Sequence, residues 1–111
     1  MKREAKEIYP TLKITPKPDD EFGVKFEKDM QISIQKVENV STNAYGEKVV
    51  AIVVDSKDSK VYGVFVNNAS MKNLIKAFGE DDELWKGKIC NLKKEKDKKF
   101  NNEMIVFYPV K

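Results

Sequence analysis

The spacing of apolar residues between positions 61 and 110 predicts a strand, a short helix and two more strands. An apolar run at residues 61–67 predicts the first strand, and further runs at residues 88–94 and 104–110 predict the other two. Between them, apolar side chains recur at i, i+3, i+4 and i+7. This spacing predicts a helix of about two turns at residues 71–78, with a stripe formed by Met71, Leu74, Ile75 and Phe78. Because so short a helix is unstable alone in water, its stripe is expected to fill an opening left by other elements.

The residues around this helix favour the same boundaries. Asn68 or Ser70 can accept a hydrogen bond from the first free backbone N–H groups, and Gly79 stands where helices commonly end. The acidic run at residues 80–83 is expected to cap a one-turn helix before Trp85. The indole of Trp85 is expected to be buried in the core, as a lone tryptophan usually is.

The amino-terminal half also predicts strands. Apolar and polar residues alternate from Val24 to Ile34, which is typical of an antiparallel strand with one solvated face. The alternation changes phase near residues 35–38, where we expect a β-bulge. Residues 49–54 are all apolar, so this strand needs cover on both faces. The core can supply one cover, and the amino-terminal arm, a second copy of the chain or a ligand can supply the other.

Loops and an arm complete the predicted order of elements. Residues 41–47 are typical of a loop, and residues 55–60 are typical of a hairpin turn. Residues 1–21 are predicted to form an extended arm, because prolines at positions 10, 16 and 18 exclude a helix. The remaining residues, 22–111, are predicted to form one domain.

Composition narrows the chemistry that this chain can perform. It has no histidine and a single cysteine, Cys90, which removes the commonest general base and the usual ligands of a tetrahedral zinc site. We therefore expect no enzymatic activity, no metal site and no cofactor. The acidic runs at residues 19–21 and 80–83 are interpreted as solvated turns, and a magnesium-dependent hydrolase is the least favoured alternative.

Cysteine usage and the first residues of the sequence bear on its compartment. A single cysteine cannot form an internal disulfide and fits a reducing environment. The charged residues 1–4 are not followed by an apolar run, so no secretory signal is predicted. No apolar stretch is long enough to span a membrane. We expect a cytoplasmic protein, in the host cytoplasm if it is viral, and its many lysines and glutamates suit a thermophile.

The predicted order is an arm, three strands, a helix and two strands. This is the order of the OB-fold, a five-stranded Greek-key barrel whose helix plugs one end between the third and fourth strands. A sharply bent first strand, shared by both halves of such a barrel, fits the predicted bulge. The alternative is a small open sheet with the helix packed on one face. The predicted class is therefore mainly β with one short helix.

Part of the chain resembles a known group of proteins. The segments that carry the resemblance are residues 64–68, 74–81 and 85–89, followed by Leu92; the most specific is Phe-Gly-Glu-Asp, an acidic spacer and Trp-x-Gly-Lys. They look like a pattern in small phage and archaeal-virus proteins with OB-fold-like domains that bind single-stranded DNA or take part in replication. The resemblance implies an OB-fold and single-stranded nucleic acid as the partner.

The candidate binding residues lie in the two loops and the strand that OB-folds use for oligonucleotides. Residues 93–99 hold five lysines and two acids, so their charge of +3 equals that of the whole chain. Lysines attract phosphates, and aromatic side chains can stack on bases. Whichever of Tyr62 and Phe65 points outward could add a stacking platform. The predicted site consists of Lys93, Lys94, Lys96, Lys98, Lys99, Phe100, Tyr45, Phe65 and Tyr62.

Two further interpretations stay open at this point. The lysine-rich hairpin can be a solvated turn, and its aromatic residues can belong to the core. The doubly apolar strand at residues 49–54 also fits a protein-interaction module that forms a homodimer through this strand. The sequence does not separate DNA from RNA, since contacts to the 2′-hydroxyl leave no compositional signal.

Overall fold

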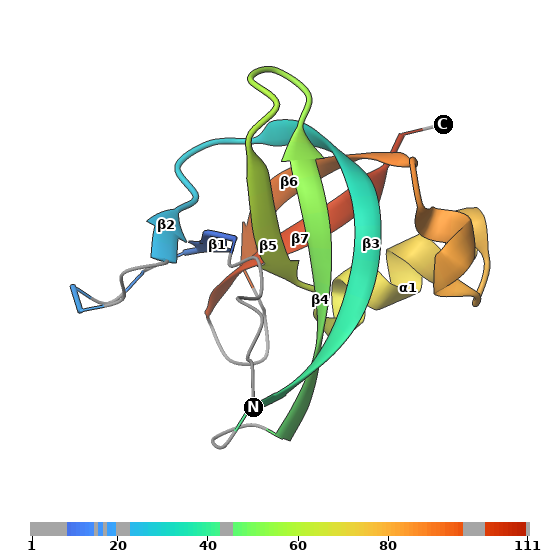
Figure 1. Ribbon diagram of the computed structural model, residues 1–111, viewed down its shortest axis with the longest axis horizontal. Coiled ribbons are helices and arrows are strands. Elements are labelled where there is room, and N and C mark those ends of the chain that lie inside the picture. Colours follow the sequence, from blue (N-terminus) through green and yellow to red (C-terminus); the bar gives the residue numbers. More distant parts are fainter. Residues whose placement is uncertain are drawn as a thin grey trace, which may run out of the picture.

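The computed structural model describes residues 9–14, 16, 18–19, 23–42, 46–96 and 102–110, with side chains at 40–42 excepted. In this part of the chain, a seven-stranded sheet is accompanied by one α-helix and one short 3-10 helix (Figure 1). The elements are β1 (Thr11–Lys13), β2 (Gly23–Lys25), β3 (Met30–Thr42), β4 (Gly46–Asp55), β5 (Val61–Phe65), α1 (Asn68–Phe78), η1 (Asp82–Trp85), β6 (Ile89–Lys96) and β7 (Glu103–Pro109). Their order in the sheet is β2-β1-β5-β4-β3-β6-β7. The prediction of a mainly β chain with one short α-helix is confirmed.

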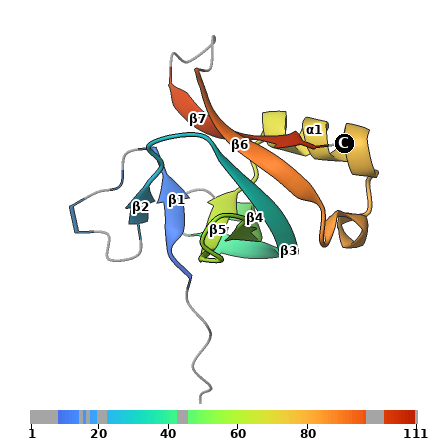
Figure 2. The ribbon, with the colours of Figure 1, turned by 90° about the horizontal axis from the view of Figure 1, so that it is seen from above.

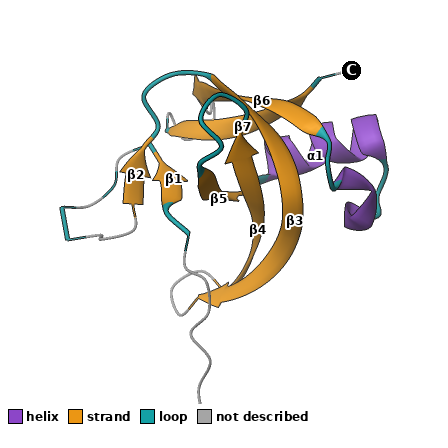
Figure 3. Cartoon of the chain, turned by 45° about the horizontal axis from the view of Figure 1, so that its top comes forward, coloured by secondary structure: helices purple, strands orange, loops and turns teal. Residues whose placement is uncertain are grey.

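Strand β3, with 13 residues, is a long and curved strand of the sheet (Figure 3). It pairs with β4 on one edge and with β6 on the other. The register with β4 shifts between Ile34 and Lys36, which confirms the predicted bulge. The pairing of β3 with β6 ends at Ser33, and the next residue, Ile34, bonds with the turn before β6. The backbone N–H of Ile34 donates to Lys88 O at 2.9 Å, and its carbonyl oxygen accepts from Gly87 N at 2.7 Å. A bulge bends a strand and increases its twist, so β3 can serve both halves of the sheet.

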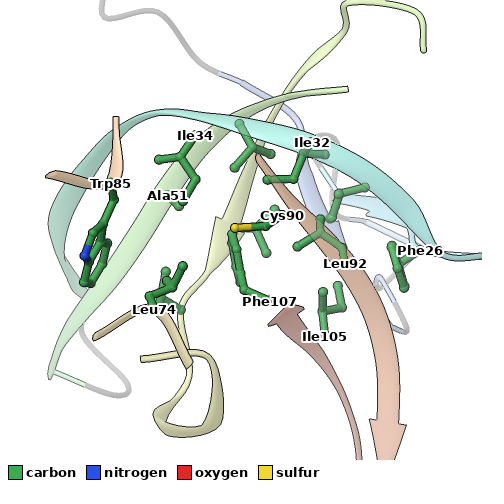
Figure 4. Close-up of a cluster of buried hydrophobic side chains, with 14 residues drawn as sticks. Phe26, Ile32, Ile34, Ala51, Leu74, Trp85, Cys90, Leu92, Ile105 and Phe107 are labelled. Carbon is green, nitrogen blue, oxygen red and sulfur yellow. The ribbon is translucent and has the colours of Figure 1, made fainter. Parts of the chain in front are cut away.

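The core lies on the inner face of this curved sheet (Figure 4). Trp85, at the end of η1, is 2% exposed, and its indole N–H donates to the carbonyl oxygen of Gly79 at 2.9 Å. The predicted burial of Trp85 is therefore confirmed, and so is the capped one-turn helix before it, since Asp81 accepts from Glu83 N. The largest fully buried side chains are Phe26, Phe107, Ile32, Ile34, Leu74 and Leu92.

Helix α1 begins earlier than the apolar spacing predicted. Its N-cap is Asn67, whose side-chain oxygen accepts from Ser70 N at 2.9 Å, so the prediction of Asn68 or Ser70 as the cap was wrong. The predicted end is confirmed at Gly79, which has a φ of 104° and donates to Ile75 O. The side chain of Ile75 is 37% exposed and thus does not belong to the buried stripe. Leu74 is buried in the core, and Met71 and Phe78 pack against it.

The sheet is open, so the predicted closed five-stranded barrel is not found. One reason is that the free edge of β5 is occupied by β1. Thr11 pairs in parallel with Gly63, and Gly63 N donates to Pro10 O at 2.8 Å. Part of the predicted arm thus joins the sheet, and β2 pairs in parallel with β1 at the outer edge.

The second reason is that α1 occupies the other edge of the sheet. Asn67 Nδ2 donates to Ile105 O, Ser70 Oγ accepts from Phe107 N, and Asn73 Nδ2 donates to Phe107 O, all at 2.9–3.0 Å. These three side chains bond to backbone groups of β7. In a closed barrel, the same groups would have to bond to a neighbouring strand. Figure 2 shows α1 beside β7 and the pair β1 and β2 on the opposite side of the molecule. The sheet is open, as in the alternative prediction, but α1 lies along the edge of β7 and not on one face as that prediction expected.

The turns and remaining strands differ in detail from their predicted bounds. The predicted strand from Val24 to Ile34 is interrupted, because β2 ends at Lys25 and β3 begins at Met30. The predicted loop at 41–47 is shorter, because β3 extends to Thr42 and β4 begins at Gly46. The hairpin turn between β4 and β5 is confirmed, with Asp55 accepting from Lys57 N at 2.8 Å.

Candidate nucleic-acid interface

Strands β6 and β7 form the stem of the predicted basic hairpin. Their antiparallel ladder extends to the pair Lys96 and Glu103, so three of the predicted lysines lie in the strand itself and not in the turn. Because side chains alternate along a strand, Lys93 points to the outer face of the sheet. Lys94 and Lys96 point to the other face, the one on which Leu92 is buried.

The outer face of the stem holds Lys93 against an aromatic ring. Lys93 Nζ lies 5.6 Å from the centroid of the Tyr108 ring, within the range of a cation–π contact. The hydroxyl of Tyr108 donates to the carboxylate of Glu95, two residues further along the same face. Tyr108 therefore orients both a positive and a negative group on this face. Phe107 points into the core, so the alternation of side chains along β7 directs Tyr108 outward. Tyr108 was not among the predicted site residues.

The inner face of the stem is less engaged. Lys94 Nζ lies 3.6 Å from Glu103 Oε2, and both side chains are partly exposed. Such an exposed ion pair contributes about 0–1 kcal/mol, so it leaves the lysine available to another anion. Lys96 is exposed and forms no ion pair within the described part of the chain.

The other predicted basic and aromatic residues fall between described strands. In the sequence, Lys98, Lys99 and Phe100 lie between β6 and β7, and Tyr45 lies between β3 and β4. All four lie outside the described residues. Their predicted role stays a prediction.

The structure separates the two aromatic residues of β5. Tyr62 lies on the inner face, is half-buried and packs against the core. Phe65 points outward and is 40% exposed. Phe65 is therefore the residue of this strand that can offer a ring to a base, whereas Tyr62 is engaged in the core.

The outer face around Phe65 is apolar with a charged margin. Phe65 stands opposite Val50 of β4, and Val50 stands opposite Glu38 of β3. Glu38 pairs with Lys36 at 3.0 Å. Ile52, also on this outer face, is only 5% exposed within the single chain. The second face of the fully apolar run at residues 49–54 is thus covered at Ile52 within the single chain.

In the part of the chain that the structure describes, no group of three or more cysteine, aspartate or glutamate side chains could hold a metal ion. Burial raises the pKa of the Cys90 thiol to about 11, so this side chain stays protonated at neutral pH and is a poor nucleophile. Among the described residues, no helix has the length and apolarity needed to cross a membrane.

Comparisons with protein-family models, with curated proteins and with solved structures found no match for this chain. The resemblance carried by the helix end and the Trp-x-Gly-Lys segment therefore stays a hypothesis.

Proposed function

We propose that this protein binds single-stranded nucleic acid, with single-stranded DNA favoured, with little sequence preference and without catalysing a reaction. The observation that carries the proposal is the outward, 40% exposed ring of Phe65 on a sheet whose hairpin stem, separated from β5 by two strands, carries Lys93 on the same outer face and two further lysines on the other face. An exposed aromatic ring gives any base a stacking surface, and lysines attract phosphates irrespective of sequence.

The strand order supports the same proposal. Strands β5, β4, β3, β6 and β7 are consecutive neighbours in the sheet, and α1 connects β5 to β6. We propose that this arrangement is an OB-fold opened between its third and last strands, with β1 and α1 on the two edges. OB-folds use the outer face of their second and third strands for oligonucleotides. In the proposed correspondence these strands are β4 and β5, and the outward position of Phe65 on β5 supports it as part of the proposed binding face.

A titration of labelled single- and double-stranded oligonucleotides at two salt concentrations tests the proposal. We expect tighter binding of the single strand and an affinity that falls with salt. Each phosphate contact that is lost should lower the slope of log K against log salt by about 0.7. Replacing Lys93, Lys94 and Lys96 together by glutamine should therefore flatten the salt dependence.

The control for this experiment is Lys72→Gln, a lysine on the exposed side of α1. This substitution removes a charge without touching the stem, and the salt slope should stay close to that of the native chain. Absence of binding at low salt, or binding that ignores salt, would contradict the proposal. An obligate dimer in sedimentation with no oligonucleotide binding would favour the protein-interaction module.

A further inference from the structure

A row of apolar residues crosses the outer face of the sheet, and the proposed function does not use it. The strand register places one outward residue of each strand directly beside the next, from β5 through β4 and β3 to β6. At the last step, Val110 N donates to Ile89 O at 2.9 Å. The five residues of this apolar band are Val61, Val54, Ser33, Ile89 and Val110.

The apolar band is most exposed where β6 meets the end of β7. Ile89 is 43% exposed and Val110 is 37% exposed, whereas the other three residues are half-buried. An antiparallel sheet with a solvated face normally carries polar side chains at its outward positions. Here four of the five are apolar and none is charged. Contiguous exposed apolar residues mark interaction surfaces, whereas scattered ones are normal on any protein.

The charges around the apolar band suit a second copy of the chain. On one side, Lys36 pairs with Glu38 at 3.0 Å. On the other side, Tyr108 holds Lys93 against its ring and donates to Glu95. Each margin therefore sums to zero, and the band itself has no cation to attract phosphates. In a two-fold symmetric dimer a surface meets its own copy, and this neutral surface does so without net repulsion.

The size of the apolar band indicates a weak dimer. Because neighbouring strands lie about 4.8 Å apart, the band is about 19 Å long, and the adjoining rows of outward residues widen it to about 14 Å. This face covers on the order of 300 Å² per copy, less than the ~800 Å² that each partner buries in a standard interface. We therefore expect a dimer that dissociates readily on dilution.

We infer that two copies of this chain pack face to face through the apolar band. Phe65 follows Val61 by four residues in β5, and Lys93 follows Ile89 by four residues in β6, which runs in the opposite direction. The two residues thus lie beyond opposite sides of the band on the same face. A copy seated on the band crosses any path between them, so the dimer and a bound strand exclude each other. The exclusion rests on the proposed function, whereas the dimer does not.

Sedimentation of the full chain over a range of concentrations, without nucleic acid, tests the dimer. Ile89→Lys and Val110→Lys each place a charge in the band, where it meets its own copy across the two-fold axis. Leu84→Lys is the matched control, because Leu84 lies in η1 outside the band and is 54% exposed, more than either band residue. We expect the dissociation constant of the dimer to rise at least about tenfold in both band variants and to change by less than about twofold in the control.

Several results would overturn the dimer. A native chain that is still monomeric at about 1 mM would do so. A dimer that both band variants leave intact, or that Leu84→Lys weakens equally, would also do so. Thermal unfolding of each variant separates a lost contact from a lost fold. Val110 lies after the end of β7, so its variant keeps the test available if Ile89→Lys does not fold.

An oligothymidine of about six nucleotides tests the exclusion. Added in excess to the dimer, it should yield complexes that contain one chain each. A complex of the intact dimer with the oligomer would overturn the exclusion and leave both the dimer and the proposed function standing. If the dimer forms but no oligomer binds at low salt, the proposed function and the exclusion fail and the dimer stands.

Discussion

The hydroxyl oxygen of Ser70 accepts a hydrogen bond from the backbone N–H of Phe107 at 3.0 Å, across 37 residues of sequence. Both residues are fully buried. This contact places α1 along the free edge of β7, where Asn67 and Asn73 bond to neighbouring carbonyls. A single face of the helix thus covers a sheet edge that would otherwise be open to pairing with another chain.

Substitution of Ser70 by alanine should destabilise the fold. It leaves the buried N–H of Phe107 without a partner, which costs about 1–3 kcal/mol. The higher helix propensity of alanine offsets about 0.5 kcal/mol of this. Urea denaturation should show a lower midpoint with an unchanged m-value. Ser56→Ala, at an exposed position of the β4–β5 turn, is the control and should shift the midpoint little. Equal midpoints for the two variants would contradict the assigned role of Ser70.

Two glycine substitutions should differ in their effect on stability. Gly79 has a φ of 104°, and an added Cβ would lie 3.3 Å from Leu84 Cδ1, so Gly79→Ala is expected to cost about 1–3 kcal/mol. At Gly63 the added Cβ would meet only ordinary contacts of 3.5–4.0 Å. Gly63→Ala should therefore be neutral or stabilise the chain by up to about 1 kcal/mol, because alanine restricts the unfolded state. Thermal unfolding of both variants measures the difference. A Gly79→Ala variant as stable as the native chain would show that the helix end tolerates another conformation.

The buried thiol of Cys90 should react slowly with alkylating reagents. Its pKa is raised from 9.0 to about 11 by burial. At pH 8 the thiolate fraction is then about a hundredfold smaller than in the unfolded chain, and alkylation should be slower by at least that factor. The same shift affects stability. The pKa of the thiol is higher in the folded chain than in the unfolded chain. Its contribution to the free energy of unfolding is therefore complete below pH 9 and is lost as the pH rises towards 11.

Rates of alkylation in native buffer and in denaturant provide the measurement for Cys90. The chain in denaturant is the internal control, since its thiol is fully accessible. The Cys90→Ala variant has no thiol to ionise, so its stability should fall less above pH 9 than that of the native chain. Comparable alkylation rates in the two states would show that the side chain is accessible in the folded protein.

Phe65 should contribute to binding through its ring. Phe65→Leu keeps an apolar side chain but removes the stacking surface, and a stacked base is worth about 1–3 kcal/mol. The affinity for single strands should fall by about fivefold to a hundredfold, while the salt slope stays unchanged because no charge is removed. Phe65→Tyr retains the ring and should retain the affinity. If leucine and tyrosine variants bind equally well, stacking at this position plays no part.

Local sequence patterns determined most of the elements and several of their ends. The alternation before Ile34 and its change of phase predicted the bulge, because a strand with one buried face must keep its apolar side chains on that face. The acidic run, Gly79 and Trp85 predicted the capped turn after the helix for equally local reasons. The lysines of the stem were also evident from the sequence alone.

The tertiary structure alone decided how the edges of the sheet are covered and which residues face outward. Asn67, Ser70 and Asn73 form a polar stripe whose partners lie 34–38 residues away, and no spacing rule identifies those partners. The pairing of Thr11 with Gly63 is likewise a contact between distant segments, and it takes the edge that barrel closure needs. Phe65 and Tyr62 have similar local sequence surroundings, and only their placement on opposite faces of β5 separates a candidate stacking ring from a core residue. Local sequence determines which elements form, whereas the competition among distant polar groups for the same strand edges determines how they assemble.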